Sequence, residues 1–328
     1  MWFWEFRNIN MHSAFMCCMK VIDGYKEGNI HFKWSPHSSP VAHISPGEKI
    51  SIKIPDSSTM QIKKDYSTAD LAKIDHSRVD AAVGPVYVDG AEKGDTLKIK
   101  IESIETGTWG WSAMMKDFGS LSNMFGEKLI IWELRDNKAK SITEDFLNDV
   151  TVPLNPFLGI IGTAPEDGEY GMIPPQTFGG NMDNRFLRAG STLYLPVNVP
   201  GALISFSDPH ATQGDGEVCG TAIETSCTAV VTIELIKNKR VKYPRIESME
   251  SMKSDCIVSM GIGDSMEESA RTAIMEMIDI LSEYGFSGEE SYILCSVAGN
   301  LRISEMVDMP NFVVSLAMDK SIIENKKI

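Results

Sequence analysis

The sequence predicts a mainly β protein, a sandwich or barrel, with a smaller mixed α/β portion at its C-terminal end. Two observations predict the β body. Short segments alternate apolar and polar residues, and turn signals such as Pro46-Gly47 and Asp89-Gly90 separate them about every 8–12 residues. The smaller portion is predicted because apolar residues recur at helical spacing after about residue 245.

Five segments of the body are expected to form strands. Three of them alternate apolar and polar side chains, as in EKISIKI: residues 48–54, 97–104 and 231–235. Two are short apolar runs, residues 193–197 and 202–206, which we expect to be buried strands joined by a tight connection. No glycine-rich phosphate-binding loop opens a helix, which argues against a nucleotide-binding sheet.

The C-terminal segment predicts two helices and a strand. Apolar residues at helical spacing predict the first helix over residues 266–281, where Ser265 with Glu268 predicts a capping box and Gly285 the end of the helix. A shorter helix capped by Ser287 and Glu290, and then a strand over residues 312–318, are expected to follow.

These patterns divide the chain into three parts. Residues 1–18 are interpreted as an N-terminal extension with Met19 as the natural start, because polar residues interrupt any apolar segment of a signal peptide. Residues 19–245 form the β-rich catalytic body, and residues 246–328 form the mixed α/β C-terminal portion.

Composition excludes several classes of protein. The chain has 31 Lys+Arg against 45 Asp+Glu and a formal charge of −14, which argues against a nucleic-acid-binding surface. No apolar run approaches the roughly 20 residues that span a bilayer, so no membrane partner is expected. The six cysteines form no C-x-x-C pair, and with 19 methionines they favour a reducing, cytoplasmic setting.

One segment gathers potential ligands in glycine-rich surroundings. Within residues 183–224 lie His210 and five carboxylates: Asp183, Asp208, Asp215, Glu217 and Glu224. Imidazole with two or three carboxylates is the ligand set of a catalytic zinc or a related divalent ion that leaves a position open for water. The spacings do not match one helix face, so a site here would be built from loops and strand ends. The run G-D-G-E is equally typical of a polar turn.

Cys219 offers a nucleophilic alternative, since it follows His210 by nine residues. The cysteine lies where a strand is expected to begin, and no nucleophile elbow or papain-like context surrounds it. A small buried side chain is therefore the favoured interpretation of Cys219.

The sequence resembles the acetamidase/formamidase family over nearly its whole length from about Met19. The matching stretches are GPVYVDGAEKGDTLKIKI at residues 84–101, PFLGIIGTAP at 156–165, GGNMDNRFLRAGSTLYLPVNVPGALISFSDPHATQGDGEVCGTAIE at 179–224 and LCSVAGNLRISEMVD at 294–308. The resemblance implies a jelly-roll-like β-sandwich. It also implies metal-dependent hydrolysis of formamide, acetamide or similar short amides to a carboxylate and ammonia, and a homo-oligomer.

The resemblance extends to individual residues. Asn181 and Asp183 match a G-G-N-x-D element, Asp208 and His210 a G-D-x-H element, Asp215, Glu217 and Glu224 a G-D-G-E…I-E element, and Asp56 an early aspartate of the family. Two positions depart from it: Asp80 stands where many relatives carry His, and Ser207 replaces a glycine. The Asp80 departure could alter the choice of metal or the range of substrates.

We therefore expect an amidase with a metal-activated water. Asp183, His210 and Glu217 are expected to hold a divalent ion, Zn²⁺ in the first instance, with Glu224 or Asp215 as general base. Asp56, Asn181, Asp208 and Asp80 are expected to bind substrate or support the site. The alternative is a non-enzymatic, cation-dependent β-sandwich binding module, in which the acidic loops hold a structural Ca²⁺.

Overall fold

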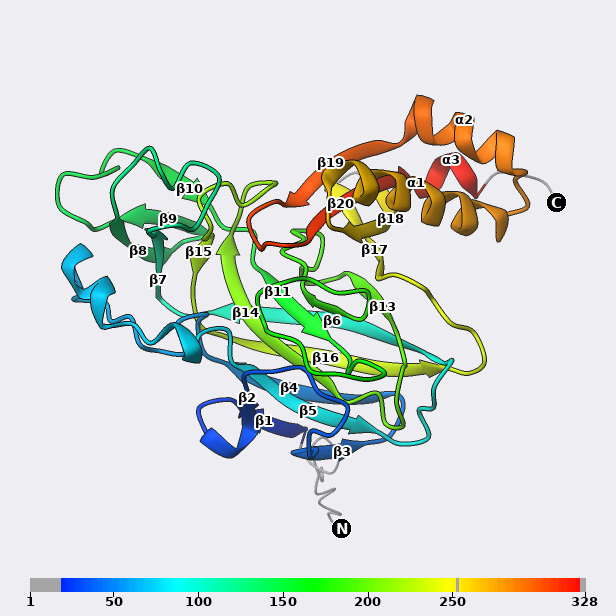
Figure 1. Cartoon of the computed structure of the whole chain (residues 1–328), viewed down its shortest axis with the longest axis horizontal. Helices are drawn as coiled ribbons and strands as arrows, with labels where there is room; N and C mark the ends of the chain where they lie inside the picture. Colours follow the sequence, from blue (N-terminus) through cyan, green and yellow to red (C-terminus); the bar gives the residue numbers. More distant parts are fainter. Residues whose placement is uncertain (1–18, 252–253, 325–328) are drawn as a thin grey trace, which may run out of the picture.

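The computed structural model describes residues 19–251 and 254–324. The interpretation of residues 1–18 as an extension lies outside these residues. The described chain is mainly β, as expected, with two large sheets and helices gathered near the C-terminus (Figure 1).

The first sheet has nine strands within the described residues. In spatial order they are β1 (Lys20–Asp23), β4 (Glu48–Ile54), β16 (Cys227–Ile236), β6 (Thr96–Thr106), β13 (Thr192–Pro196), β17 (Arg245–Ser251), β18 (Ser254–Gly263), β20 (Phe312–Asp319) and β19 (Asn300–Glu305). Strands β17 to β20, from the last third of the chain, extend the sheet that begins with β1 and β4.

The second sheet carries the functional strands. Its path is β10 (Thr151–Pro153), β9 (Lys138–Ser141), β8 (Lys128–Arg135), β7 (Trp109–Met114), β15 (Ile223–Glu224), β14 (Ile204–Thr212), β11 (Phe157–Gly162) and β12 (Gly179–Asn181). Strand β5 (Ala82–Val88) also pairs with β14, and β2 (Ile30–His31) and β3 (Ala42–Ile44) pair with β5. Three 3₁₀ turns complete this region: η1 (Glu27–Asn29), η2 (Thr68–Lys73) and η3 (His76–Arg78).

The main core lies between the two sheets and follows the predicted alternation. Ile50, Ile52 and Ile54 are fully buried on one face of β4, where they join residues of both sheets in one apolar cluster. Burying such side chains contributes about 1.5–3 kcal/mol each relative to leaving them exposed. The expected strands at 48–54, 97–104 and 231–235 are confirmed as β4 and as parts of β6 and β16.

Residues 193–197 and 202–206 fall mostly in β13 and β14, so two buried strands are present as expected, but these strands do not pair with each other. Strand β13 belongs to the first sheet and β14 to the second, so the connection crosses the sandwich instead of closing a hairpin. Ala202 and Leu203 are apolar and buried, yet they have φ values of 58° and 52° and form a turn. As a result β14 begins at Ile204 and runs to Thr212, which places Asp208 and His210 inside a strand.

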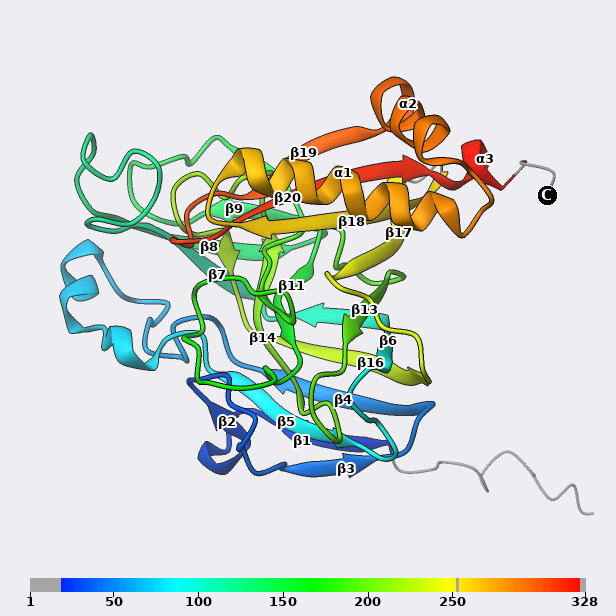
Figure 2. The same cartoon turned by 45° about the vertical axis from the view of Figure 1, so that its right-hand side comes forward.

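The helices lie on the C-terminal strands. Helix α1 (Met266–Ser282) lies along β18 in Figure 2, and Gly261 permits this approach because a Cβ there would be 1.8 Å from the Ser269 carbonyl oxygen. Helix α2 (Gly288–Ala298) and α3 (Lys320–Ile323) follow. Within the described residues, no helix is both long and apolar enough to cross a membrane.

The predicted helix ends are found with one difference. Ser287 and Glu290 form the full capping box of α2, whereas at α1 the structure shows the Ser265 half, in which the Glu268 N–H donates to Ser265 Oγ. Gly285 has φ 82°, and its N–H donates to the Ser282 carbonyl oxygen in the last turn.

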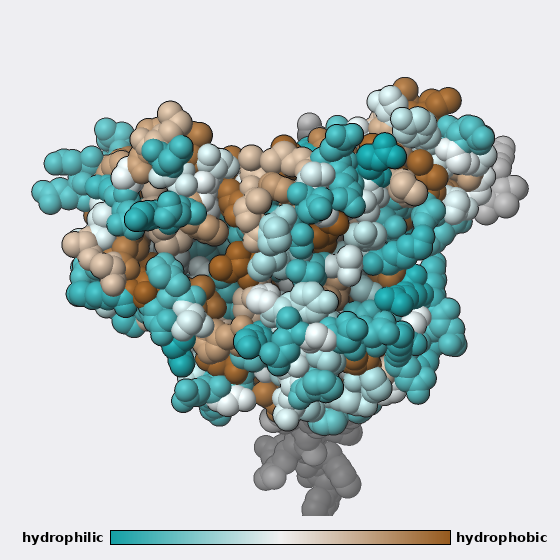
Figure 3. Space-filling view, viewed as in Figure 1, coloured by the Kyte–Doolittle hydropathy of each residue, from teal (hydrophilic) through white to brown (hydrophobic). Residues whose placement is uncertain are grey.

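On the surface drawn in Figure 3, hydrophilic residues predominate, and hydrophobic residues gather near the centre of the view. This region lies between the β7–β10 lobe and the helices, which Figure 1 places on opposite sides in the same orientation.

Candidate metal and active site

Strand pairing brings the predicted ligands together. His210 on β14 lies opposite Glu224 on β15, and β11 lies between β14 and β12, the strand that ends at Asn181. Gly159, in the middle of β11, has no side chain and so leaves room for the carboxylates of Asp183 and Asp208. A Cβ at Gly159 would lie 2.4 Å from both Asp183 Oδ1 and Asp208 Oδ2, so no other residue could be accommodated there without moving the carboxylates.

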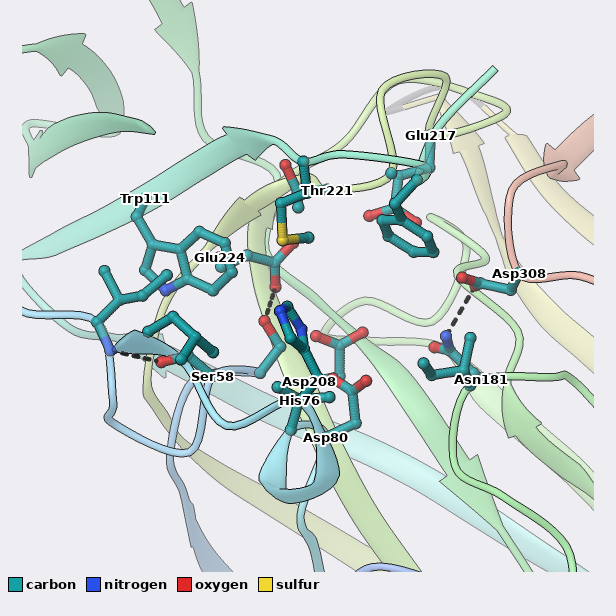
Figure 4. Close-up of a pocket in the computed structure, with 18 of the residues that line it drawn as sticks. Ser58, His76, Asp80, Trp111, Asn181, Asp208, Glu217, Thr221, Glu224 and Asp308 are labelled. Carbon is teal, nitrogen blue, oxygen red and sulfur yellow. Dashed lines mark hydrogen bonds between the residues drawn. The ribbon is translucent and has the colours of Figure 1, made fainter. Parts of the chain in front are cut away.

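Four carboxylates surround the imidazole of His210. Its Nε2 lies 3.0 Å from Asp208 Oδ2, 3.3 Å from Glu224 Oε2 and 3.9 Å from Glu217 Oε1, and its Nδ1 lies 3.9 Å from Asp183 Oδ1. All five residues are buried, and Phe157 packs edge-on against the imidazole. Figure 4 shows Asp208, Glu217 and Glu224 pointing into one cavity.

The backbone of the cluster is strained. Asp80, Asp183, Asp208 and Glu217 have φ values of 54°, 40°, 54° and 45°, in the left-handed region that most residues avoid. Each such residue costs roughly 1–3 kcal/mol, and strain of this kind gathers at active sites and ligand clamps. Four acidic residues of one cluster sharing this conformation indicate that the fold positions their carboxylates for function.

Gln213 fixes the orientation of the imidazole. Its amide nitrogen donates to the carbonyl oxygens of Asp183 (2.9 Å) and Ser304 (3.4 Å), which leaves its amide oxygen to accept from His210 Nδ1 at 2.9 Å. Nδ1 therefore keeps its proton, and Nε2, which faces the carboxylates, is the nitrogen that would bind a cation in place of its own proton. Gln213 lies outside the ligand set expected from the sequence.

We expect Gln213→Leu to weaken divalent-metal binding by about 10–100-fold, because a ligating histidine depends on the partner of its other nitrogen. Competition with a fluorescent chelator measures this affinity. Gln176→Leu is the matched control, since Gln176 donates to the Pro174 carbonyl oxygen away from the cluster. Equal affinities for the two variants and the unaltered chain would contradict the positioning role.

The donor atoms fit a metal ion. Two sets of buried groups have ligand atoms within 4.8 Å of one another, Asp183–His210–Glu217 and Asp208–His210–Glu224. His210 Nε2 and Asp183 Oδ1 are buried, and neither makes a well-aligned hydrogen bond, although Asp208 Oδ2 lies 3.0 Å from Nε2. Leaving buried polar atoms in this state is costly for a protein unless another group satisfies them. His210 is common to both sets.

The raised pKa values of the buried carboxyl groups also indicate a site for a cation. Burial raises the pKa of Glu224 to about 7 and raises the pKa values of Asp183 and Glu217 well above the usual range, with the neighbouring carboxylates adding to the effect. Burial alone would lower the pKa of His210, but the carboxylates of Asp208 and Glu224 raise it well above 6.5. Protons thus neutralise the metal-free cluster, and a divalent ion would take their place.

A cavity of about 480 Å³ opens over the cluster. Its lining includes Asp80, Asn181, Asp183, Asp208, His210, Glu217 and Glu224, together with apolar side chains of the segment around η2 and of β7. An acidic group at one side of an apolar cavity is the usual arrangement of a site for a small organic molecule.

A profile of the Acetamidase/Formamidase family matches residues 22–169 and 167–325. The chain belongs to this family. A formamidase of Methylophilus methylotrophus is 25% identical over 371 residues, covering 91% of this chain and 90% of that protein. An acetamidase of Mycolicibacterium smegmatis is 25% identical over 347 residues, covering 80% and 84%. The crystal structure of acetamidase from Yersinia enterocolitica is 29% identical, with a TM-score of 0.84 and coverage of 93% of each chain.

Not every residue expected at the site of this family member lies in the cluster. Asp215 is exposed and forms ion pairs with Arg185 (3.7 Å) and Arg302 (3.4 Å), and it does not line the cavity. Asp56 is buried beside the cavity, where it accepts hydrogen bonds from the Ser58 N–H and from Trp111 Nε1 at 3.3 Å. Asp80 and Asn181 line the cavity.

The expectation of a buried Cys219 is wrong. Cys219 is exposed, and its thiol contacts the Thr221 carbonyl oxygen at 3.4 Å. Cys219 lies in a turn before β15 and is not among the residues that line the cavity, so its thiol is separated from the acidic cluster.

Sequence reasoning missed the contribution of the C-terminal segment. Asp308 lines the cavity and accepts from Asn181 Nδ2 at 2.8 Å, and the nearby Glu305 is fully buried. Gly216, in the turn that leads to Glu217, bridges to Glu305, and its N–H donates to the Ser304 carbonyl oxygen. Both acids lie in the stretch LCSVAGNLRISEMVD, so the resemblance to the family could have pointed to them as site residues.

The cluster makes the stability of the metal-free enzyme depend on pH. Glu224 and Glu305 have pKa values raised from 4.5 to about 7 by burial, so their stabilising contribution is present below pH 4.5 and is lost as pH rises through about 7. We expect the melting temperature in chelator to fall by several degrees between pH 5 and 7.5, and added metal to reduce this fall. Thermal melts across this range test the prediction, and a rising melting temperature in chelator would contradict it.

Proposed function

We propose that the chain hydrolyses small primary amides, formamide and acetamide among them, to a carboxylate and ammonia. The observation that carries the proposal is the Nε2 of His210, held among buried carboxylates at a cavity in a chain of this family. The proposal includes a divalent ion at this cluster, with Zn²⁺ as the first candidate.

The donor set supports zinc over calcium. Calcium takes oxygen ligands almost exclusively, whereas an imidazole with carboxylates is a common zinc set. When bound, such an ion supplies Lewis-acid polarisation of the amide oxygen and lowers the pKa of a water ligand. His210 would hold the ion through Nε2, and Asp183, Asp208 and Glu217 are the carboxylates offered for the remaining positions.

Glu224 is the residue we propose for proton transfer. Ser57 Oγ donates to its Oε2 at 2.8 Å and the Ala222 N–H donates to its Oε1 at 2.7 Å, so the carboxylate is held firmly beside the cluster. Burial raises the pKa of this carboxyl to about 7 in the metal-free cluster. As a carboxylate it can accept a proton from the attacking water and return it to the departing ammonia. Asp80 and Asn181 face the same cavity and are placed to contact the amide.

Ammonia release from formamide and acetamide tests this function. The zinc-loaded protein is expected to release ammonia from both amides, and exhaustive chelation is expected to abolish the release until metal is restored. No release from any small amide, combined with tight cation binding, would favour the non-enzymatic binding module. Release that survives chelation would remove the metal from the mechanism.

A further inference from the structure

The cavity is much larger than the smallest amides. At about 30 Å³ for each water, 480 Å³ corresponds to roughly sixteen water molecules. Formamide has only three non-hydrogen atoms and acetamide four, so either would leave most of the cavity filled with water. A volume of this size lies in the range of sites that enclose ligands of ten or more non-hydrogen atoms.

The chemistry of the walls is divided. Beside the acidic cluster, apolar side chains make up much of the remaining lining: Ile62, Leu71, Ile74, Trp111, Met115 and Phe118. A few polar residues, Lys116 and Glu127 among them, also line the cavity. Figure 4 shows Trp111 and Asp308 at opposite sides of the cavity, with the carboxylates of Asp208 and Glu224 between them. A primary amide placed at the cluster would therefore direct its acyl group toward the apolar wall.

The side chains of the apolar wall are held in place by their own packing. Ile62, Leu71 and Trp111 are 2%, 6% and 4% exposed and belong to a separate apolar cluster with strand residues of β7 and β8. The Trp111 ring is held by its Nε1–H, which donates to the buried Asp56. Because the wall is already ordered, an acyl group entering it would gain from apolar burial with little ordering of the protein.

We propose that the preferred substrates are primary amides with an apolar acyl group larger than acetyl, a chain of about six carbons or a single ring, which the cavity has room to enclose. This proposal rests on the amidase function proposed above and narrows its substrate class. Methylenes that leave water for the wall of Ile62, Leu71 and Trp111 add binding free energy, and formamide and acetamide have the fewest carbons to bury there.

A homologous series of amides on the metal-loaded protein tests the proposal. We expect kcat/KM to rise about three- to fourfold for each added methylene from acetamide to hexanamide, the equivalent of ~0.8 kcal/mol. The rise should lie mainly in KM, because the wall binds ground state and transition state alike. Benzamide should exceed acetamide.

The outcomes separate this proposal from the proposed function. A kcat/KM that is highest for formamide or acetamide and falls with each methylene would overturn the substrate class and leave the amidase function standing. Ammonia release from no amide of the series would overturn both. Calorimetry on the metal-free protein adds a second readout, in which hexanamide should bind more tightly than acetamide and with a negative heat-capacity change.

A substitution in the apolar wall tests whether the acyl group binds there. Ile74 lines the cavity and is only partly buried, so a larger side chain there would reduce the room for the acyl group. Ile74→Trp is expected to lower the ratio of kcat/KM for hexanamide to that for acetamide by at least about tenfold. Met275→Trp is the control, since Met275 is 64% exposed on α1 and its variant should keep the ratio. An unchanged ratio in folded Ile74→Trp would overturn this placement.

Discussion

His210→Ala is expected to lower amidase kcat/KM by at least about 10³-fold and to remove most of the bound metal. The imidazole supplies the Nε2 shared by both donor sets, and without it three or four buried carboxylates would have to hold the ion among themselves. Steady-state kinetics with formamide, together with metal analysis of the purified variant, measures both losses.

The matched control for this variant is His43→Ala. His43 is exposed, and its imidazole lies 3.6 Å from the Asp89 carboxylate on the surface. This variant should keep both activity and metal content. Full turnover and full metal content in His210→Ala would contradict the proposed site, and activity that also resisted chelation would return attention to the exposed thiol of Cys219.

Glu224→Gln is expected to lower kcat by about 10²–10⁴-fold while the metal stays bound. The amide keeps the shape of the side chain and can still accept from Ser57 and Ala222, but it cannot take a proton from water. The expected signature is a fall in kcat with little change in KM. Loss of metal from this variant would show instead that Glu224 is a ligand.

Asp215→Asn is the contrasting variant. Its carboxylate is paired with Arg185 and Arg302 outside the cavity, so the change is expected to alter kcat less than about threefold. The two acids were equal candidates for the general base from the sequence. A loss in Asp215→Asn as large as that in Glu224→Gln would assign the proton transfer to Asp215.

Much of the fold could be predicted because it depends on local patterns. The isoleucines of β4 alternate, and one face of the strand is fully buried, so their spacing alone indicates a strand. The start of β14 at Ile204, two residues later than expected, has a local cause as well. Ala202 and Leu203 are apolar and therefore resemble strand residues, but Gly201 precedes them with φ 78° and the backbone turns there.

The composition of the site could be predicted only in part. His210, Asp208 and Glu224 are close in sequence, so the concentration of possible ligands in this segment is evident from the sequence. The contact between Asn181 and Asp308 joins residues 127 positions apart, and it depends on the order of strands in two sheets. The role of Gln213 depends on the direction of one amide group, which no spacing encodes.

The bridge between Gly216 and Glu305 has a consequence for how the protein is made. Residues from Ser57 to Asp308 meet in one cavity, and the turn before Glu217 is bridged to the end of β19. During synthesis, a chain from which β19 has not yet emerged from the ribosome lacks both Asp308 and the strand that bridges to that turn. Loading of the proposed ion would therefore follow synthesis of nearly the whole chain, and a nascent fragment that carries His210 would present acidic side chains without an assembled site.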